Sequence, residues 1–108
     1  MDELIAGFLR RSRSRYTAGH IKKALQDNLS IVTEDGFIIF NIVQDECYIL
    51  FCYVRPGKDV TPFKEAVELY AKLQGCRYVK FLTNREKAFA RRFKDYRPTA
   101  RLFEKEMK

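Results

Sequence analysis

The chain has 108 residues, of which 46% are hydrophobic and 32% charged, and its formal net charge at pH 7 is +7. This length suits one compact domain over residues 1–108, in which residues 1–16 form an N-terminal helix and a basic linker. No apolar run approaches the roughly 18 residues of a membrane span, and the acidic start lacks the basic region of a secretory signal, so we expect a soluble cytoplasmic protein without a membrane partner. Three cysteines without a Cys-x-x-Cys pair, together with a single histidine, give too few ligands for a zinc site, so no metal is expected.

Positive charge gathers in the last third of the chain. Residues 1–76 contain ten Lys or Arg and ten Asp or Glu, whereas residues 77–108 contain eleven and four. Such an asymmetry is typical of proteins that bind an acidic partner, such as nucleic acid, a phosphate-rich ligand or an acidic protein surface. A solvated basic face explains the same pattern equally well.

Two amphipathic helices are expected before the first strand. Apolar residues recur at helical spacing within residues 4–9, between an acidic start and a basic end. Residues 10–15 hold four arginines, and we interpret this run as a linker rather than a nucleic-acid-binding arm. The second helix has Thr17 as its N-cap and ends at about Asn28, and His20 on it needs no chemical role.

Three antiparallel strands are expected to follow as a meander. Residues 30–33 and 37–43 are rich in β-branched and aromatic side chains and are separated by a turn that contains Asp-Gly, a strong hairpin signal. A second polar turn, residues 44–46, leads into a third strand at residues 47–54.

The strand of residues 47–54 is apolar at both parities, which is typical of a strand that lies in the middle of a sheet and is covered on both faces. Cys47 and Cys52 differ in parity along it, and with Cys76 they are expected to be reduced core residues. Ligands of open α/β sheets gather beyond the carboxyl ends of strands, so the loop of residues 55–60 is where a site is sought first.

A helix follows this loop, with Thr61 as the predicted N-cap, Pro62 in the first helical position and Gly75 at the end. Residues 76–83 then form a short β-rich run. Because the helix has the length of a crossover, this run can pair parallel with residues 47–54.

The C-terminal third is expected to contain a basic helix that starts at Asn84 and ends at Arg97 and Pro98. Residues 99–107 suit either a helix or an edge strand, and we predict a strand that closes the sheet. The predicted fold class is therefore α/β with a mixed (α+β) sheet: two N-terminal helices, an antiparallel three-strand meander, a crossover helix, a parallel strand, a basic helix and a closing C-terminal strand.

This order of elements resembles the GNAT acetyltransferase fold over most of residues 17–107. The most specific part is Asn84 at a strand end, Tyr96 twelve positions later and the closing Leu-Phe-Glu-Lys of residues 102–105, similar to the family's Asn-x-x-Ala…Tyr-x-x-x-Gly-Phe…Glu-Lys ending. The family's usual first strand is missing, because this chain opens with a helix. The resemblance implies acetyl-CoA as the cofactor if the protein is an enzyme.

The phosphate loop of the family is altered in this chain. Acetyltransferases of this kind hold the CoA pyrophosphate on a Gln/Arg-x-x-Gly-x-Gly/Ala loop, whose backbone N–H groups approach the phosphates. Here Gly57 is the one glycine left, Pro56 has no N–H, and Asp59 brings negative charge, although Arg55 and Lys58 can still attract phosphate. The cofactor-binding residues that the resemblance implies are Val54, Arg55, Gly57, Lys58, Thr61 and Asn84.

The general acid of the family is altered too. Many members carry a Tyr seven positions after the Asn to reprotonate the CoA thiolate, and Arg91 occupies that position here. An arginine stays protonated, so Arg91 can stabilise a thiolate but cannot be an ordinary proton donor, and the family glycine before the aromatic is replaced by Asp95. A base would have to come from Glu46 or from a water, so Glu46 and Arg91 are weak catalytic candidates.

With these motifs altered, the chain resembles small phage-encoded proteins with a GNAT-like fold, including virion components. The resemblance implies a non-catalytic structural or interaction protein that needs no cofactor and works in the cytoplasm or within a virion; the alternatives are a small acetyl-CoA-dependent N-acetyltransferase and a dedicated nucleic-acid binder. The expected partner is an acidic protein surface or a larger assembly, and oligomers are possible. Nucleic acid would bind weakly at most, because Phe89, Phe93 and Tyr96 are needed for the helix's own burial. The expected interaction residues are Arg85, Arg91, Arg92, Lys94, Arg97 and Arg101.

Overall fold

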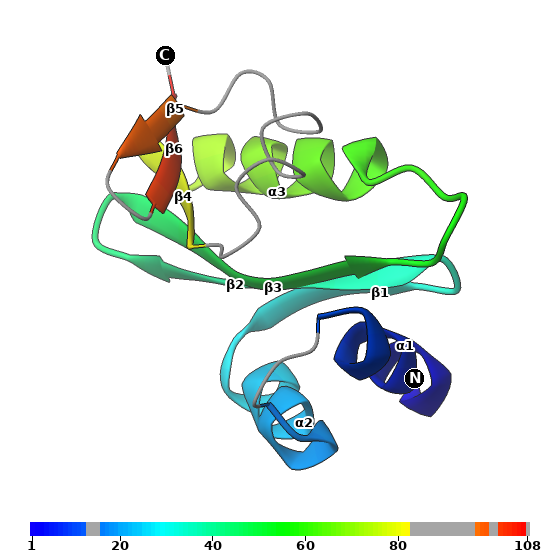
Figure 1. Ribbon diagram of the computed structural model, residues 1–108. Helices are drawn as coiled ribbons and strands as arrows, with labels where there is room; N and C mark the ends of the chain where they lie inside the picture. Colours follow the sequence, from blue (N-terminus) through cyan, green and yellow to red (C-terminus); the bar gives the residue numbers. More distant parts are fainter. Residues whose placement is uncertain (13–15, 83–96, 100–101, 108) are drawn as a thin grey trace.

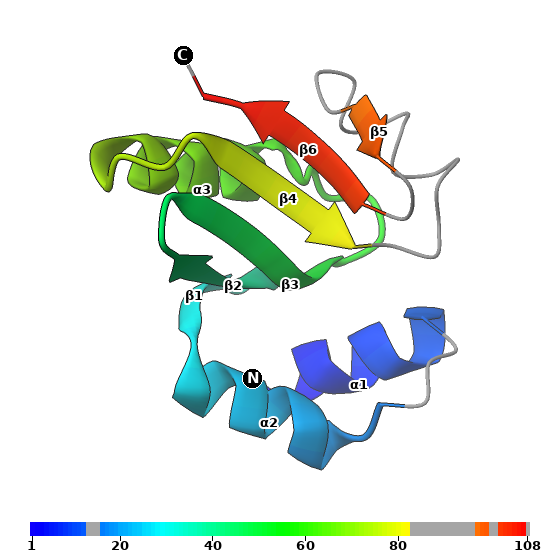
Figure 2. The same cartoon turned by 90° about the vertical axis from the view of Figure 1, so that its left-hand side faces the viewer.

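The computed structural model describes residues 1–12, 16–82, 97–99 and 102–107 of the chain. Its elements are α1 (Asp2–Ser12), α2 (Ala18–Asp27), β1 (Leu29–Thr33), β2 (Gly36–Val43), β3 (Glu46–Val54), α3 (Thr61–Leu73), β4 (Tyr78–Leu82), β5 (Arg97–Thr99) and β6 (Leu102–Glu106). Within these residues, six strands form one sheet in the order β1-β2-β3-β4-β6-β5, and β3 and β4 are its parallel pair. Helix α3 covers one face of the sheet, and α1 and α2 lie on the other (Figures 1 and 2). The predicted mixed α/β architecture is confirmed, including the meander, the crossover helix and the parallel strand.

The two N-terminal helices form where the sequence pattern places them. Helix α1 has acidic residues in its first turn and Arg10 and Arg11 in its last, which complements the helix dipole at both ends. Helix α2 has Thr17 as its N-cap, as predicted, and the Thr17 hydroxyl accepts a hydrogen bond from the His20 N–H at 3.3 Å. In return, His20 Nδ1 accepts from the Thr17 N–H at 3.0 Å, so this histidine closes a capping box.

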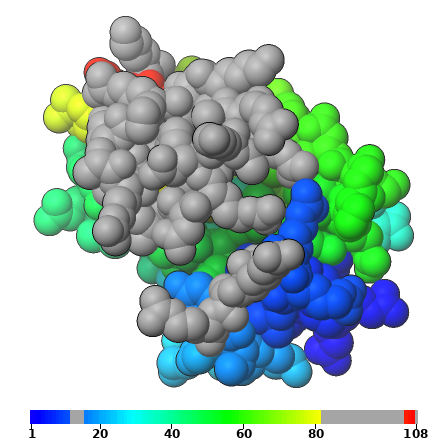
Figure 3. All heavy atoms as spheres, in the orientation of Figure 1, coloured from blue at the N-terminus to red at the C-terminus, as the bar shows by residue number. Residues whose placement is uncertain are grey.

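The sheet separates two apolar cores. On the α3 side, the buried residues are Ile38, Phe40, Cys47, Ile49, Val54, Val60, Phe63, Val67, Ala71, Cys76 and Val79. On the side of α1 and α2, they are Leu4, Ile5, Ile21, Phe37, Ile39 and Tyr53. Strand β3 contributes to both cores, which is why its sequence is apolar at both parities. The space-filling view shows the same layers, with α1 and α2 in blue below and α3 in green at the upper right (Figure 3).

Strand β3 carries a bulge at Leu50. Phe40 of β2 pairs with Ile49, but the neighbouring Ile39 pairs with Phe51, so Leu50 is the extra residue on β3. An extra residue shifts the alternation of side chains by one position and kinks the strand. The residues of β3 after the bulge therefore point to the opposite face from the one that strict alternation predicts.

The bulge explains where the cysteines lie. Cys47 and Cys52 differ in parity along β3, yet both pack in the core beneath α3, together with Cys76. Burial raises the pKa of the Cys47 thiol to about 12 and also raises the pKa of Cys76. Both of these thiols are buried and outside any disulfide, so they stay protonated at neutral pH and serve the core, as predicted.

The start of α3 differs from the prediction. Val60 occupies the N-cap position and makes no side-chain capping bond, while Thr61 is already the first helical residue. The reason is Asp59, whose carboxylate oxygen Oδ1 accepts the Thr61 N–H at 2.9 Å and so replaces a hydroxyl cap. The predicted N-cap at Thr61 is therefore wrong by one residue.

Gly75 ends α3 as predicted, but the following strand begins later than expected. Gly75 has φ of +79°, and the next N–H, that of Cys76, donates back to the Ala71 carbonyl at 2.9 Å. This closing turn extends through Cys76, so β4 begins at Tyr78 rather than at residue 76.

The C-terminal region closes the sheet as predicted, but with one strand more. The closing strand β6 lies beside β4, and β5 pairs with β6 on its other side. Arg97 and Pro98 were expected to end a helix and instead belong to β5; a proline is tolerated there because an edge strand leaves one row of backbone groups unpaired. The predicted basic helix from Asn84 lies within residues 83–96, outside the described residues. None of the helices that the structure describes is long and apolar enough to span a membrane.

Candidate functional site

The connection from β3 to α3 is a tight turn rather than an open glycine loop. The Lys58 N–H donates to the Arg55 carbonyl at 3.0 Å, with Pro56 and Gly57 between them and Gly57 at φ of +82°. Proline followed by a residue with positive φ defines a type II turn. The turn therefore fixes the loop by a hydrogen bond within the chain.

The N-terminus of α3 has few N–H groups left to offer. The Thr61 N–H is taken by the Asp59 carboxylate, Pro62 has none, and the Phe63 N–H donates to the Val60 carbonyl at 3.0 Å. A helix N-terminus binds phosphate through these same groups. An internal carboxylate, that of Asp59, thus occupies the position that a phosphate oxygen takes at such a helix N-terminus.

The two basic residues of the loop are turned toward other parts of the molecule. Arg55 Nε donates to the Glu34 carbonyl at 2.7 Å, and its terminal nitrogen lies 3.4 Å from Glu3 Oε2. Lys58 Nζ lies 3.8 Å from Asp35 Oδ1. Both side chains thus bind the β1–β2 turn or α1 rather than the start of α3.

Strands β3 and β4 part beyond the bulge. Their pairing runs from Glu46 with Tyr78 to Ile49 with Phe81 and does not extend to the second half of β3. The side chain of Leu50, at the point of separation, is 40% exposed. Within the described residues, β3 and β4 are therefore not hydrogen-bonded to each other beyond Ile49.

Glu46, the candidate base, lies at the other end of β3 in a polar cluster. Its carboxylate accepts a short hydrogen bond from the Tyr48 hydroxyl and lies 3.0 Å from Lys80 Nζ. The hydrogen bond from Tyr48 and then that from Lys80 lower the pKa of Glu46, and the same carboxylate raises the pKa of Tyr48. A carboxylate that is held ionised in this way is a weak proton acceptor.

The remaining predicted site residues are spread over the chain. Val54 is buried at the end of β3, and its carbonyl accepts a hydrogen bond from Arg11 at 3.2 Å. Arg97 belongs to β5. The other predicted site residues lie outside the described residues: Asn84, Arg85, Arg91, Arg92, Lys94 and Arg101. The structure thus brings Val54, Arg55, Gly57, Lys58 and Thr61 together and keeps Glu46 about 25 Å away along β3.

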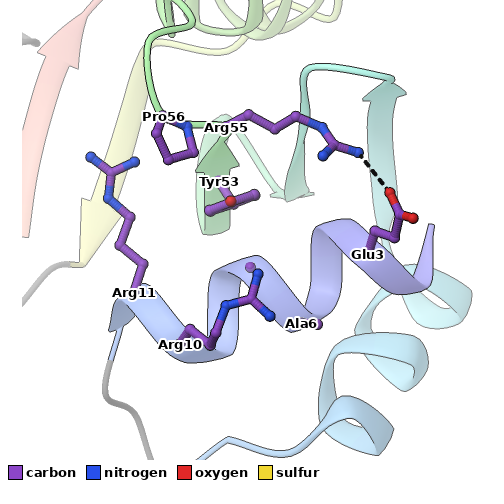
Figure 4. A pocket seen from close by; sticks show the side chains of 8 residues that line it. Glu3, Ala6, Arg10, Arg11, Tyr53, Arg55 and Pro56 are labelled. Carbon is purple, nitrogen blue, oxygen red and sulfur yellow. Dashed lines mark hydrogen bonds and ion pairs between the residues drawn. The ribbon is translucent and has the colours of Figure 1, made fainter.

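A cleft of about 850 Å³ between α1 and the end of β3 was not expected from the sequence. Arg10, Arg11 and Arg55 line it, together with the buried Tyr53. Figure 4 shows these side chains, with Arg55 turned toward Glu3. The sequence signal was the basic end of α1, which we interpreted as the start of a linker.

No family model and no curated protein matches the chain. Among solved structures, GCN5 of Tetrahymena superposes with a TM-score of 0.68 at 16% identity, covering 99% of this chain and 86% of that one. The PaiA N-acetyltransferase of Thermoplasma acidophilum, in complex with coenzyme A, gives 0.66 at 18% identity and covers 99% and 80%. The anti-CRISPR protein AcrVA5 gives 0.61 at 17% identity and covers 71% and 96%.

These similarities establish the fold of the chain, which is that of GNAT acetyltransferases. At identities below 20% they establish no activity. The fold expected from the order of the sequence elements is thereby confirmed.

Proposed function

We propose that this GNAT-like protein is a non-catalytic interaction protein whose acetyl-CoA motifs are eroded. The observation that supports the proposal is the start of α3, where the Asp59 carboxylate takes the N–H of Thr61. Beside it, the Pro56–Gly57 turn uses the Lys58 N–H. A phosphate group would have to displace the Asp59 carboxylate from the Thr61 N–H and would be repelled by its negative charge.

Calorimetric titration with acetyl-CoA tests this proposal. The wild-type chain should show no binding in the micromolar range. Replacement of Asp59 by Ala frees the Thr61 N–H and removes a negative charge, so it should increase the affinity for acetyl-CoA by about tenfold. Glu65→Ala is the matched control, because it removes the same charge from an exposed position on α3 without freeing a backbone donor.

Micromolar binding by the wild-type chain that weakens in Arg55→Ala or Lys58→Ala would contradict the proposal. An equal gain in Asp59→Ala and Glu65→Ala would show that charge alone, and not the blocked helix N-terminus, controls affinity.

A second candidate function, a small acetyl-CoA-dependent N-acetyltransferase, is favoured by the end of the β3–β4 pairing at Leu50. The superposed acetyltransferases, one of them in complex with coenzyme A, favour it too. An assay of acetyl transfer to a panel of amines, read by mass spectrometry, distinguishes the two functions. Acetylated product would support the acetyltransferase, and binding of acetyl-CoA without product would indicate an inactive ligand-binding protein.

For the partner, we propose an acidic protein surface in a larger assembly, which for a phage-encoded protein would be the virion. The support is the charge of the last third of the chain, eleven basic against four acidic residues. We expect the side chains of Arg91 and Arg92 to be exposed, and exposed charge changes rarely alter stability by more than about 0.5 kcal/mol. Substitution of both by Glu should therefore abolish docking and leave folding intact, whereas loss of folding would show that these arginines are structural. Tight, sequence-selective DNA binding at physiological salt would contradict this assignment.

A further inference from the structure

The cleft between α1 and the end of β3 is positively charged. Arg10 and Arg11 reach it from the last turn of α1, and Arg55 reaches it from the first residue after β3 (Figure 4). One carboxylate, that of Glu3, lines the same cleft, and its side chain is 85% exposed. Three arginines and one highly exposed carboxylate thus line the same cleft.

Most of the donors on these arginines bond nothing among the residues that the structure describes. Arg11 gives one hydrogen bond to the Val54 carbonyl, and Arg55 bonds Glu34 and Glu3. Arg10 makes no hydrogen bond or ion pair within the part of the chain that the structure describes. Each guanidinium carries five N–H donors, in a planar arrangement that matches the oxygens of a carboxylate or a phosphate.

Tyr53 provides a second and independent indication. The residue is only 8% exposed, and its ring packs against Phe37. Its hydroxyl lines the cleft and has no hydrogen-bond partner among the described residues. A buried tyrosine hydroxyl normally finds a partner, so an unpartnered one beside a cleft indicates a ligand group that bonds it.

Gly7 lets the Tyr53 hydroxyl reach this position. A Cβ at residue 7 would lie 2.7 Å from Tyr53 Cζ and closer still to the hydroxyl oxygen. Any other residue would push the ring and α1 apart. The absence of a side chain at Gly7 therefore keeps the hydroxyl at the floor of the cleft.

Helix stabilisation alone does not account for this arrangement. Arginines at the end of α1 complement the helix dipole, which explains Arg10 and Arg11 as charges. It does not explain why the buried Tyr53 hydroxyl beside these arginines lacks a partner among the described residues.

We infer that this cleft binds a small molecule that carries a phosphate or carboxylate group on an apolar body. The anionic group is held by the guanidinium groups and the Tyr53 hydroxyl, and the apolar body lies against Ala6, Pro56 and the tyrosine ring. The volume of about 850 Å³ suits such a ligand better than a bare ion. This site shares Arg55 and Pro56 with the loop after β3, but its other lining residues belong to α1 and to Tyr53 of β3 rather than to the start of α3.

Phenyl phosphate, benzoate and inorganic phosphate are suitable probes, titrated into the full chain at constant ionic strength and followed by amide chemical shifts in NMR. Phenyl phosphate or benzoate, or both, should shift the amides of Ala6, Gly7 and Arg55, and the one that binds more tightly identifies the anionic group. Inorganic phosphate should bind at least about tenfold more weakly, since it lacks the apolar body.

Two variants and a matched control decide whether the named groups form the site. Arg10→Gln and Tyr53→Phe should each weaken binding of the better probe about tenfold without unfolding the chain, since neither side chain's polar group has a partner within the described residues. Lys72→Gln removes one exposed charge in the last turn of α3, on the opposite face of the sheet, and should leave binding unchanged.

The inference is overturned if no probe shifts these amides, or if Lys72→Gln weakens binding as much as Arg10→Gln, which would indicate general charge attraction. Inorganic phosphate that binds as tightly as phenyl phosphate would also overturn it, because the apolar body would then contribute nothing.

Discussion

Two polar clusters lie on the same face of β3, near its opposite ends, and they differ in how their groups are satisfied. Near the amino end, the Glu46 carboxylate accepts from Tyr48 and pairs with Lys80. Near the carboxyl end, the Tyr53 hydroxyl and the Arg10 guanidinium find no partner within the described residues. Satisfied polar groups stabilise a fold, whereas unsatisfied ones retain bonding capacity for a ligand, so the comparison separates a structural cluster from a candidate binding site.

The largest expected effect concerns the close approach that shapes the carboxyl-end cluster. Gly7→Ala should lower the free energy of unfolding by about 2 kcal/mol, because the new Cβ overlaps the Tyr53 ring. The measurement is urea unfolding. In Gly19→Ala, on α2, the new Cβ meets nothing nearer than 3.6 Å, so this control should be neutral or stabilising, as alanine normally is in a helix. Equal behaviour of the two variants would contradict the close packing of Tyr53 against α1.

A smaller effect is expected from removing one hydroxyl at each end of β3. Tyr48→Phe deletes a hydrogen bond to a carboxylate and should cost about 1 kcal/mol of unfolding free energy. Tyr53→Phe removes a hydroxyl that bonds nothing in the described residues, so its effect should stay within about 0.5 kcal/mol. Denaturant unfolding of both variants measures the two free energies of unfolding. A larger loss of unfolding free energy for Tyr53→Phe than for Tyr48→Phe would contradict the assignment of Tyr48 to the structural cluster.

The smallest effect depends on pH. Because the folded pKa of Glu46 lies below its ordinary value of 4.5, its contribution to stability is complete above that value and is lost as the pH falls through the lowered folded pKa. The difference in unfolding free energy between the wild type and Glu46→Gln should therefore shrink from pH 7 toward pH 3. The difference for Tyr53→Phe, which leaves the Glu46 cluster intact, should stay constant over the same range. A gap for Glu46→Gln that widens on acidification would contradict the assigned direction of the pKa.

Local sequence patterns were sufficient to predict most of the described fold. Alternation and turn signals predicted the meander, and helical spacing with the cap at Thr17 predicted α2. They were insufficient where a contact joins distant residues. Whether Thr61 or Asp59 caps α3 depends on which oxygen reaches the N–H, and both types of side chain are good caps.

The candidate site was less predictable than the fold. The loop after β3 was identified because strand ends mark sites, but the direction of Arg55 depends on Glu34 and Glu3, which are far away in sequence. The cleft itself requires α1 to pack on the end of β3, and the contacting residues Arg11 and Val54 are 43 positions apart in the sequence. No local pattern near Arg10 or Arg11 contains that information.

The bulge at Leu50 shifts the alternation of side chains along β3 by one residue. The residues of β3 that face the core beneath α3 are odd-numbered up to Ile49 and even-numbered from Cys52 onward. A regular alternation applied to the whole strand therefore assigns only one half of it to the correct face. Deletion of Leu50 would join the two halves without turning any other side chain to the opposite face. One residue, Leu50, thus separates a regular β3 strand from the observed one, whose pairing with the parallel strand β4 ends halfway along.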